Sequence, residues 1–285
     1  MEAVIEAYQL RKDFKNKTAV RDVSFSIFEG EIFGFLGHNG AGKTTTIRLL
    51  TGQIRPTSGK AMIAGFNSSS EQGFIKPIIG VVSEAQNLYE RMTGLENLNL
   101  FANLYDIRKS RVQELLALVN LQSRARDKIE NYSNGMKQRL LIARALLHEP
   151  DVIFLDEPTR GLDPTSARDI KENIKNLAAS GVTVFLTTHN MEEADELCDR
   201  VAFIKEGSLI IIDTPQNLKL QYGEQSVILK LNNNESIKIP FIDPSSLQEA
   251  FSRLTKNEVQ TIHSQEATLE DVFLKLAGQE VENEL

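Results

Sequence analysis

Short apolar runs recur along the chain up to residue 220 and predict its strands. Continuous runs with almost no polar position are typical of strands buried on both faces of a parallel sheet; they lie at 31–36, 78–82, 152–155 and 182–187. Further strands are predicted at 4–10, at the alternating segment 23–28, at 60–64, and as a hairpin of 201–204 with 209–212 around Glu206-Gly207. Because the central runs alternate with helical patterns, the sequence predicts an α/β fold with a sheet rich in parallel strands.

Between about residues 84 and 150 the apolar spacing becomes helical. Leu95, Leu98 and Phe101 recur at this spacing. Ser110 to Gln113 has the capping-box pattern and predicts a helix that begins there. A long helix is predicted over 136–147. We interpret these apolar stripes as core faces, and the region as a helical subdomain.

The pattern changes again near Gly223. Short strands are predicted at 227–231, 237–239 and 259–262, and helices at 247–254 and 269–276. We therefore expect one domain over residues 1–223 and a small α/β accessory domain over 224–285.

Composition restricts the class of protein. The chain has 285 residues, 41% hydrophobic, and a net charge of −7, which disfavours nucleic acid as a partner. No apolar run approaches the ~18 residues of a membrane helix, and the first residues do not resemble a signal peptide. One cysteine, Cys198, fits a reducing compartment. We expect a cytoplasmic protein, which leaves docking on a membrane partner open.

The clearest chemistry lies in the glycine-rich segment from Gly37 to Thr45. It matches the phosphate-binding pattern G-x-x-x-x-G-K-[ST] and stands between a predicted strand and a predicted helix. Backbone N–H groups of such a loop, and of the helix that follows it, surround a phosphate. Lys43 is expected to reach the β- and γ-phosphates, and the Thr44 hydroxyl to bind Mg²⁺. The predicted nucleotide-binding loop comprises Gly37, His38, Asn39, Gly40, Ala41, Gly42, Lys43, Thr44 and Thr45.

Two acids end the predicted strand 152–155. Asp156 is expected to hold Mg²⁺, and Glu157, one residue on, to act as the base for a water in line with the γ-phosphate. Solvated acids at a strand end are the plain alternative, which the phosphate loop disfavours.

Two other features are weaker by themselves. The turn Ser133-Asn134-Gly135 opens a helix and offers a second anion site, but an N-cap serine also explains it. His189 follows a buried strand and could donate to the γ-phosphate, although a lone histidine there is more often incidental.

In combination these motifs resemble the ATPase subunits of ABC transporters over roughly residues 1–220. The matching segments, in order, are Gly37 to Thr45, Tyr132 to Gln138, Leu155 to Pro158, Gly161 to Asp163, and Thr188-His189. The resemblance implies a P-loop NTPase core with a parallel-rich sheet, an antiparallel β subdomain and a helical subdomain, which binds ATP and Mg²⁺. It implies catalytic roles for Lys43, Glu157 and His189.

The same resemblance implies roles that no single motif shows. Phe14 is expected to stack on the adenine ring. Ser133 and Gly135 are expected to complete the site of an opposite subunit, and Asp163 to link the two sites. The family usually has a glutamine that joins Mg²⁺ to the transporter-facing loop; here the position resembles Glu84, with Gln86 as the alternative. The family signature normally has two adjacent glycines followed by a glutamine; in this sequence Asn134-Gly135 and Met136 stand there.

The tail resembles a narrower group. Residues 267–278 and 87–98 resemble segments of ATPases from drug-resistance and sodium-extrusion exporters. This implies an ATP-hydrolysing subunit that forms a homodimer or a heterodimer with another ATPase subunit. It would act on the cytoplasmic face of the membrane, beside a transmembrane permease subunit. The alternative is an ABC ATPase that acts on a ribosome or a cluster-assembly complex.

Overall fold

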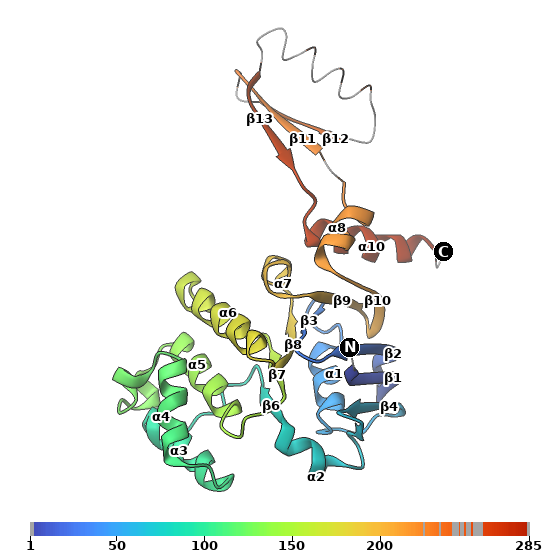
Figure 1. Cartoon of the computed structure of the whole chain (residues 1–285). Helices are drawn as coiled ribbons and strands as arrows, with labels where there is room; N and C mark the ends of the chain where they lie inside the picture. Colours follow the sequence, from blue (N-terminus) through green and yellow to red (C-terminus); the bar gives the residue numbers. More distant parts are fainter. Residues whose placement is uncertain are drawn as a thin grey trace. The chain divides into compact units, whose positions relative to one another are not determined.

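The computed structural model describes residues 3–283, apart from 225, 234, 241–244, 246, 247, 249–251 and 253–258. Its first sheet is antiparallel, with the strand order β2-β1-β4-β5 (Figure 1). The strands are β1 (Ala3–Phe14), β2 (Lys17–Phe28), β4 (Ser58–Ile63) and β5 (Phe66–Asn67). β1 and β2 form a long hairpin that extends past the predicted segments at 4–10 and 23–28.

The second sheet has the order β10-β9-β3-β8-β7-β6. It contains β3 (Ile32–Leu36), β6 (Ile79–Val82), β7 (Val152–Asp156), β8 (Thr183–Thr188), β9 (Arg200–Lys205) and β10 (Ser208–Asp213). The pairs from β9 through β6 are parallel. β3, β7 and β8 are buried throughout, which confirms the interpretation of the continuous apolar runs.

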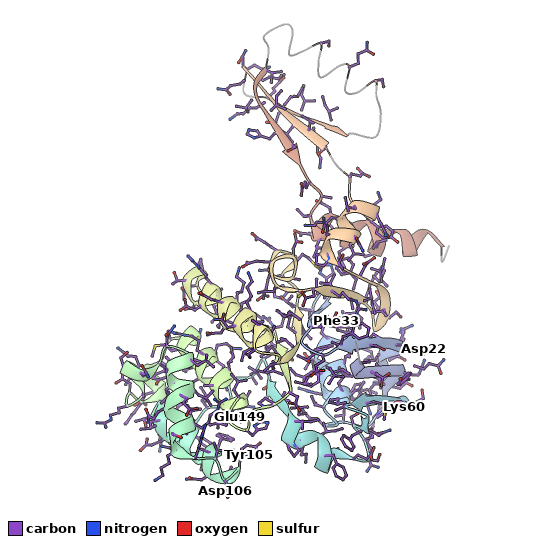
Figure 2. All side chains as sticks on the ribbon, viewed as in Figure 1. Asp22, Phe33, Lys60, Tyr105, Asp106 and Glu149 are labelled. Carbon is purple, nitrogen blue, oxygen red and sulfur yellow. The ribbon has the colours of Figure 1, made fainter. Side chains whose placement is uncertain are left out.

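An aromatic core joins the two sheets. Phe25 on β2 stacks on Phe33 of β3 with ring centroids 5.7 Å apart, and both contact Phe185 of β8. Each such pair contributes about 0.5–1.5 kcal/mol beyond the area it buries. In Figure 2, Phe33 lies inside this layer, whereas Asp22 and Lys60 are exposed on the antiparallel sheet. The core therefore fixes the carboxyl ends of β3, β7 and β8 relative to the first sheet.

Helices follow the strands of this part of the chain. The longer ones are α1 (Lys43–Leu50), α3 (Gly94–Leu104), α4 (Lys109–Leu118), α5 (Asn134–Ala145), α6 (Pro164–Ala179) and α7 (Met191–Leu197). Short turns are α2 (Gln72–Ile75), η1 (Lys76–Ile78), η2 (Gln122–Arg124) and η3 (Ile129–Asn131). α3 to α5 confirm a helical region between 84 and 150.

One predicted helix start was wrong. α4 begins at Lys109 after Arg108, without a side-chain cap, so Ser110 lies inside the first turn. The Arg111 guanidinium donates to the carbonyl of Leu146 at 3.3 Å, and this tertiary contact holds the first turn instead of a cap. A capping box does occur in the region, at Thr93 and Glu96, where α3 begins.

Residues 213–285 form a second compact unit, which we describe by itself. α8 (Pro215–Tyr222) packs on α10 (Leu269–Asn283). An antiparallel sheet has the order β12-β11-β13, from β11 (Ser226–Leu231), β12 (Ser236–Pro240) and β13 (Val259–Gln265). The helix expected at 247–254 lies outside the described residues, apart from positions 248 and 252.

The boundary between the two compact units falls between Ile212 and Asp213, before α8, whereas the sequence suggested a boundary at 223. α8 is grouped with the tail because it packs on α10. Independent folding of residues 1–223 stays a prediction. Within the described residues, no helix has both the length and the apolar character needed to cross a membrane.

Candidate active site

The glycine-rich loop connects β3 to α1, and the fold leaves no room for side chains at two of its glycines. A Cβ at Gly37 would lie 2.3 Å from the carbonyl oxygen of Ile204, and one at Gly42 would lie 2.5 Å from that of Ala19. Gly42 also has φ 112° and precedes α1 as its N-cap residue. The sequence therefore needs glycine here for both space and backbone conformation.

Backbone hydrogen bonds hold this loop against both neighbouring strands. Gly207, in the turn between β9 and β10, donates to the carbonyl of Ala41 at 2.9 Å, and Arg21 of β2 donates to the carbonyl of Gly207 at 2.7 Å. Gly37 donates to the carbonyl of Thr188 at 3.4 Å. The loop consequently has its shape fixed by the protein itself, which reduces the ordering needed when a ligand binds.

Lys43 is buried beneath the loop. Its Nζ donates to the carbonyl of Gly37 at 2.6 Å and to that of His38 at 3.3 Å. Nζ also lies 3.0 Å from Oε1 of Glu157, and the two side chains are only 6% and 5% exposed. Oε1 accepts no hydrogen bond despite this ion pair, so one oxygen of the carboxylate retains acceptor capacity.

Glu157 follows β7 and contacts the predicted histidine. Its Oε2 lies 2.7 Å from Nδ1 of His189, which follows β8. The Glu157 N–H donates to the carbonyl of Thr187 at 3.0 Å. Its φ of 53° places a residue with a side chain in the left-handed region, and such strain is concentrated at functional sites. The structure thus brings the three predicted catalytic residues together.

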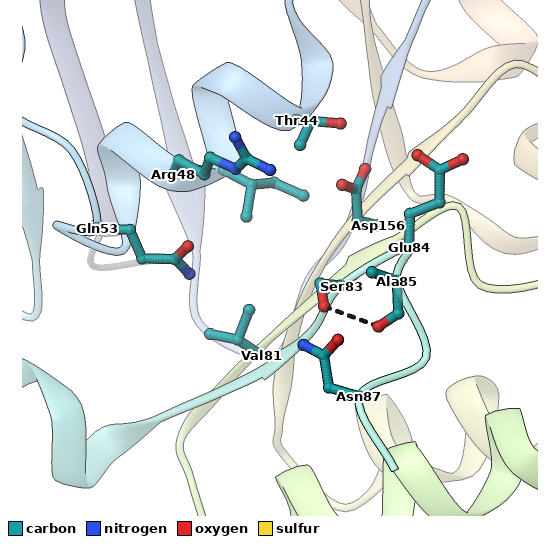
Figure 3. A pocket seen from close by; sticks show the side chains of 10 residues that line it. Thr44, Arg48, Gln53, Val81, Ser83, Glu84, Ala85, Asn87 and Asp156 are labelled. Carbon is teal, nitrogen blue, oxygen red and sulfur yellow. Dashed lines mark hydrogen bonds between the residues drawn. The ribbon is translucent and has the colours of Figure 1, made fainter.

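Asp156 is the last residue of β7 and is 2% exposed. Oδ1 accepts a hydrogen bond from the hydroxyl of Thr187 at 2.6 Å. Asp156, Thr44 and Glu84 line one cavity of about 510 Å³, and Figure 3 shows the two acids beside Thr44, opposite Arg48 and Gln53. A carboxylate pair with a hydroxyl is a donor set that suits Mg²⁺, which binds hard oxygens and completes its shell with phosphate and water.

No group of three or more His, Cys, Asp or Glu residues arranged for a metal occurs among residues the structure describes.

A neighbouring cavity, also about 510 Å³, follows the loop itself. It is lined by Gly40, Gly42, Lys43, Thr44, Thr45, Asn39 and Glu157, and by Lys17, Ala19, Glu84 and Arg160. Sequence reasoning missed Lys17 and Arg160, which belong to no motif; only the fold brings them to the loop. Lys17 donates to the carbonyl of Gly40 at 3.4 Å.

Glu84 lines both cavities, whereas Gln86 lines neither. Its carboxylate forms an ion pair with Arg160, so the loop after β6 is tied to the turn after β7. Of the two residues considered for the link between Mg²⁺ and the transporter-facing loop, only Glu84 therefore lines the cavities.

Phe14 ends β1 and pairs with Lys17 across the hairpin. Its ring is 51% exposed, with Lys12 Nζ 5.3 Å from the ring centroid. An exposed aromatic face beside a residue that lines the cavity is suited to stacking on a flat ring.

Ser133, Gly135 and Asp163 line neither of the two cavities. Ser133 caps α5 by accepting from the N–H of Met136 at 3.2 Å. Asp163 caps α6 by accepting from the N–H of Ser166 at 3.0 Å. Hydrogen bonds from Ser166 lower the pKa of the Asp163 carboxyl below its ordinary value. Within one chain, these residues are therefore separate from the phosphate loop.

Comparisons with known proteins agree with this geometry. The family described as ABC transporter matches residues 20–160. The fluoroquinolones export ATP-binding protein of Mycobacterium tuberculosis is 42% identical over 92% of this chain and 89% of its own length. The Nod factor export ATP-binding protein I of Paraburkholderia xenovorans is 36% identical over 99% of both chains. A dimeric ATP-binding cassette in a post-hydrolysis state, bound to ADP and phosphate, has a TM-score of 0.67 and 28% identity over 74% of this chain and 98% of that one.

The chain belongs to the ATP-binding subunits of ABC transporters. It has the α/β P-loop ATPase fold, binds adenine nucleotide, and is an ATPase of this family.

Proposed function

We propose that this ATP-binding subunit powers export through a separate transmembrane permease subunit, and that two cassettes bind ATP between them. The buried Lys43–Glu157 pair beneath the phosphate loop, with the half-exposed His189 on the other carboxylate oxygen, is the observation that carries the proposal. Relatives named for the export of fluoroquinolones and Nod factor support the direction of transport.

Nucleotide binding begins with a competition for Lys43. In the structure its ammonium contacts Glu157 and two loop carbonyls. The β- and γ-phosphates present a larger negative charge, so Lys43 turns toward them while the N–H groups from Gly40 to Thr45 surround the phosphate oxygens. Phe14 stacks on the adenine.

Hydrolysis then uses the freed carboxylate. Glu157 accepts a proton from a water that attacks the γ-phosphorus, while the bond to the bridging oxygen of ADP breaks. His189, held on Oε2 of Glu157, orients the carboxylate and can donate toward the γ-phosphate. Thr44, Asp156 and Glu84 fit a Mg²⁺ ion, which neutralises charge on the β- and γ-phosphates when bound.

The dimer supplies what one chain lacks in its own cavity. Ser133 and Gly135 of one protomer complete the site of its partner, and Asp163 links the two sites. The existence of a dimeric relative with ADP and phosphate supports this arrangement. The two protomers are identical copies or this chain with a homologue.

The subunit acts at the cytoplasmic face of the membrane as a peripheral protein, with no nucleic acid partner. We place the contact with the permease in the region from Glu84 to Phe101. The net charge of −7 supports the absence of nucleic acid binding.

Replacing Lys43 by Ala tests the proposal. Binding of a fluorescent ATP analogue and phosphate release should both fall at least about 100-fold, because the Lys43 charge is lost from the phosphate site. Lys60→Ala, on the exposed face of the antiparallel sheet, is the matched control and should match wild type. Undiminished ATPase in Lys43→Ala would reject the site. Export is tested in vesicles that contain the full complex with the cassettes facing outward: nucleotide added outside should drive substrate into the lumen, away from the cassettes, and nucleotide-dependent loss of substrate from preloaded vesicles would reject the direction.

A further inference from the structure

A second buried carboxylate lies close to this site, and the hydrolysis described above makes no use of it. Glu193 is the third residue of α7 and is 3% exposed. It lines neither cavity. A buried carboxylate costs free energy unless hydrogen bonds compensate it, so its contacts indicate what it is for.

Both oxygens of Glu193 accept hydrogen bonds from threonine hydroxyls. Oε1 accepts from Thr159 Oγ1 at 2.7 Å, and Oε2 accepts from Thr188 Oγ1 at 2.7 Å. The two hydrogen bonds use one carboxylate oxygen each, so an ionised carboxylate accepts both at the same time. Chain connectivity does not require this geometry, because Thr159 and Glu193 are far apart in sequence.

At the start of α7, the Glu193 side chain does not cap its own helix. Asn190 caps the helix by accepting from the N–H of Glu193 at 3.1 Å. In a reciprocal capping box, the Glu193 carboxylate would accept from the N–H of Asn190. Here that N–H donates to Thr188 Oγ1 at 3.0 Å, and the carboxylate reaches Thr159 instead.

The two threonines belong to the two functional loops of the site. Thr188 directly precedes His189. Thr159 lies in the turn from Glu157 to Asp163, which is closed by hydrogen bonds from Arg160 N to Glu157 O at 3.2 Å and from Leu162 N to Thr159 O at 3.2 Å. Glu193 therefore connects the loop that carries the histidine to the turn that carries both the base and Asp163.

The surroundings of Glu193 act on the pKa of its carboxyl in both directions. Burial raises the pKa of the Glu193 carboxyl above its ordinary value, the two hydroxyls act in the opposite direction, and the negative charge of Glu157 raises it further.

We infer that Glu193 is a positioning residue that joins the Glu157–Asp163 turn to the His189 loop, so that the base, the histidine and the partner-facing Asp163 move as one unit. The inference rests on the proposed hydrolysis for its kinetic consequence. Its structural part, the coupling of the two loops, does not depend on turnover.

Thr159→Val tests this with little change of shape, because it removes the hydroxyl and keeps the branched side chain. The expected result is a kcat about 10-fold lower, with KM and the Kd for metal-free ADP within about twofold of wild type. Amide hydrogen exchange should become faster in residues 158–163 and also in 188–190. Thr159→Ser, which restores the hydroxyl, should recover most of the kcat and the slow exchange.

Thr51→Val controls for the general cost of losing a buried threonine hydroxyl. Thr51 is 6% exposed and follows α1 as its C-cap residue. Its hydroxyl donates to the carbonyl of Ile47 at 2.8 Å, and it lines neither cavity. It should lower thermal stability and leave kcat unchanged. The inference is overturned if Thr51→Val loses as much kcat as Thr159→Val. It is also overturned if Thr159→Val keeps the kcat and the exchange rates of wild type. Neither outcome contradicts the proposed nucleotide hydrolysis. An inactive wild type rejects the proposed function instead, and the exchange measurement then decides the inference alone.

Discussion

Glu157→Gln should strengthen nucleotide binding in addition to slowing hydrolysis. In the structure the Lys43 ammonium lies against Glu157, and the competition proposed above requires it to leave this carboxylate for a phosphate. At 3.0 Å and an effective dielectric constant of about 20, the gross attraction of the two charges is about 5.5 kcal/mol. Desolvation offsets most of it.

The net free energy of the Lys43–Glu157 contact depends on how well its hydrogen bond is aligned. Interactions of this kind between charged groups contribute about 1.5–3 kcal/mol, and the lower end applies because Oε1 accepts no aligned hydrogen bond. About 1.4 kcal/mol corresponds to a tenfold change in affinity. We therefore expect the Kd for metal-free ADP to fall about tenfold in Glu157→Gln, while kcat falls by about 100-fold or more through loss of the base.

Calorimetric titration with ADP in the presence of a chelator measures this without turnover or metal. Glu84→Gln is the matched control, because it removes a carboxylate from the same cavity that is paired with Arg160 instead of Lys43. An unchanged Kd in Glu157→Gln refutes the competition for Lys43. An equal gain in Glu84→Gln attributes the effect to overall charge and refutes it as well.

Four other results are expected. Ser133→Asp should keep the N-cap of α5 and the thermal midpoint, but its negative charge should repel the phosphates and lower the ATPase rate at least about 10-fold. Ser133→Thr is the control, and normal turnover in Ser133→Asp excludes the role of Ser133 at the partner's site. Gly135→Ala should lower the free energy of unfolding by about 1–3 kcal/mol, because its Cβ would lie 2.3 Å from Ser166 Oγ, and Ser166→Gly should restore it in a denaturant titration. The Cys198 thiol should react slowly with a thiol reagent at neutral pH and rapidly in denaturant, because burial raises its pKa well above the ordinary value; fast native labelling contradicts this. Chains that end at residue 223 and at Asp213 should both bind nucleotide with the Kd of the full chain, and aggregation of both speaks against an independent core.

Local sequence was sufficient for the elements whose signals are themselves local. The apolar runs at 31–36 and 152–155 indicated β3 and β7 because a strand buried on both faces has almost no polar residue. The loop from Gly37 to Thr45 was recognisable because its glycines, lysine and threonines form one pattern within nine consecutive residues, although the atoms that exclude a Cβ at Gly37 and Gly42 belong to Ile204 and Ala19. Asp163-Pro164 marked the start of α6 for the same reason.

Long-range contacts decided what the sequence missed. Ser110 has a capping pattern, but the N-cap residue of α4 is Arg108, two residues earlier, and the Arg111 contact with Leu146 lies in the first turn. Lys17 and Arg160 line the cavity only because the hairpin and the turn after β7 meet there. Glu193 belongs to a plain acidic helix in sequence, and only the fold places Thr159 and Thr188 on its two oxygens.

The left-handed backbone at Glu157 affects which variants of this chain survive a given selection. Glycine adopts this conformation without the penalty of about 1–2 kcal/mol that a residue with a Cβ carries. Glycine would also leave the buried Lys43 ammonium without its carboxylate, and breaking a buried ion pair costs about 3–5 kcal/mol, so a screen for resistance to heat retains the acid that turnover needs. Among natural or designed versions of this cassette, glycine at residue 157 would identify proteins that bind nucleotide durably and no longer consume it.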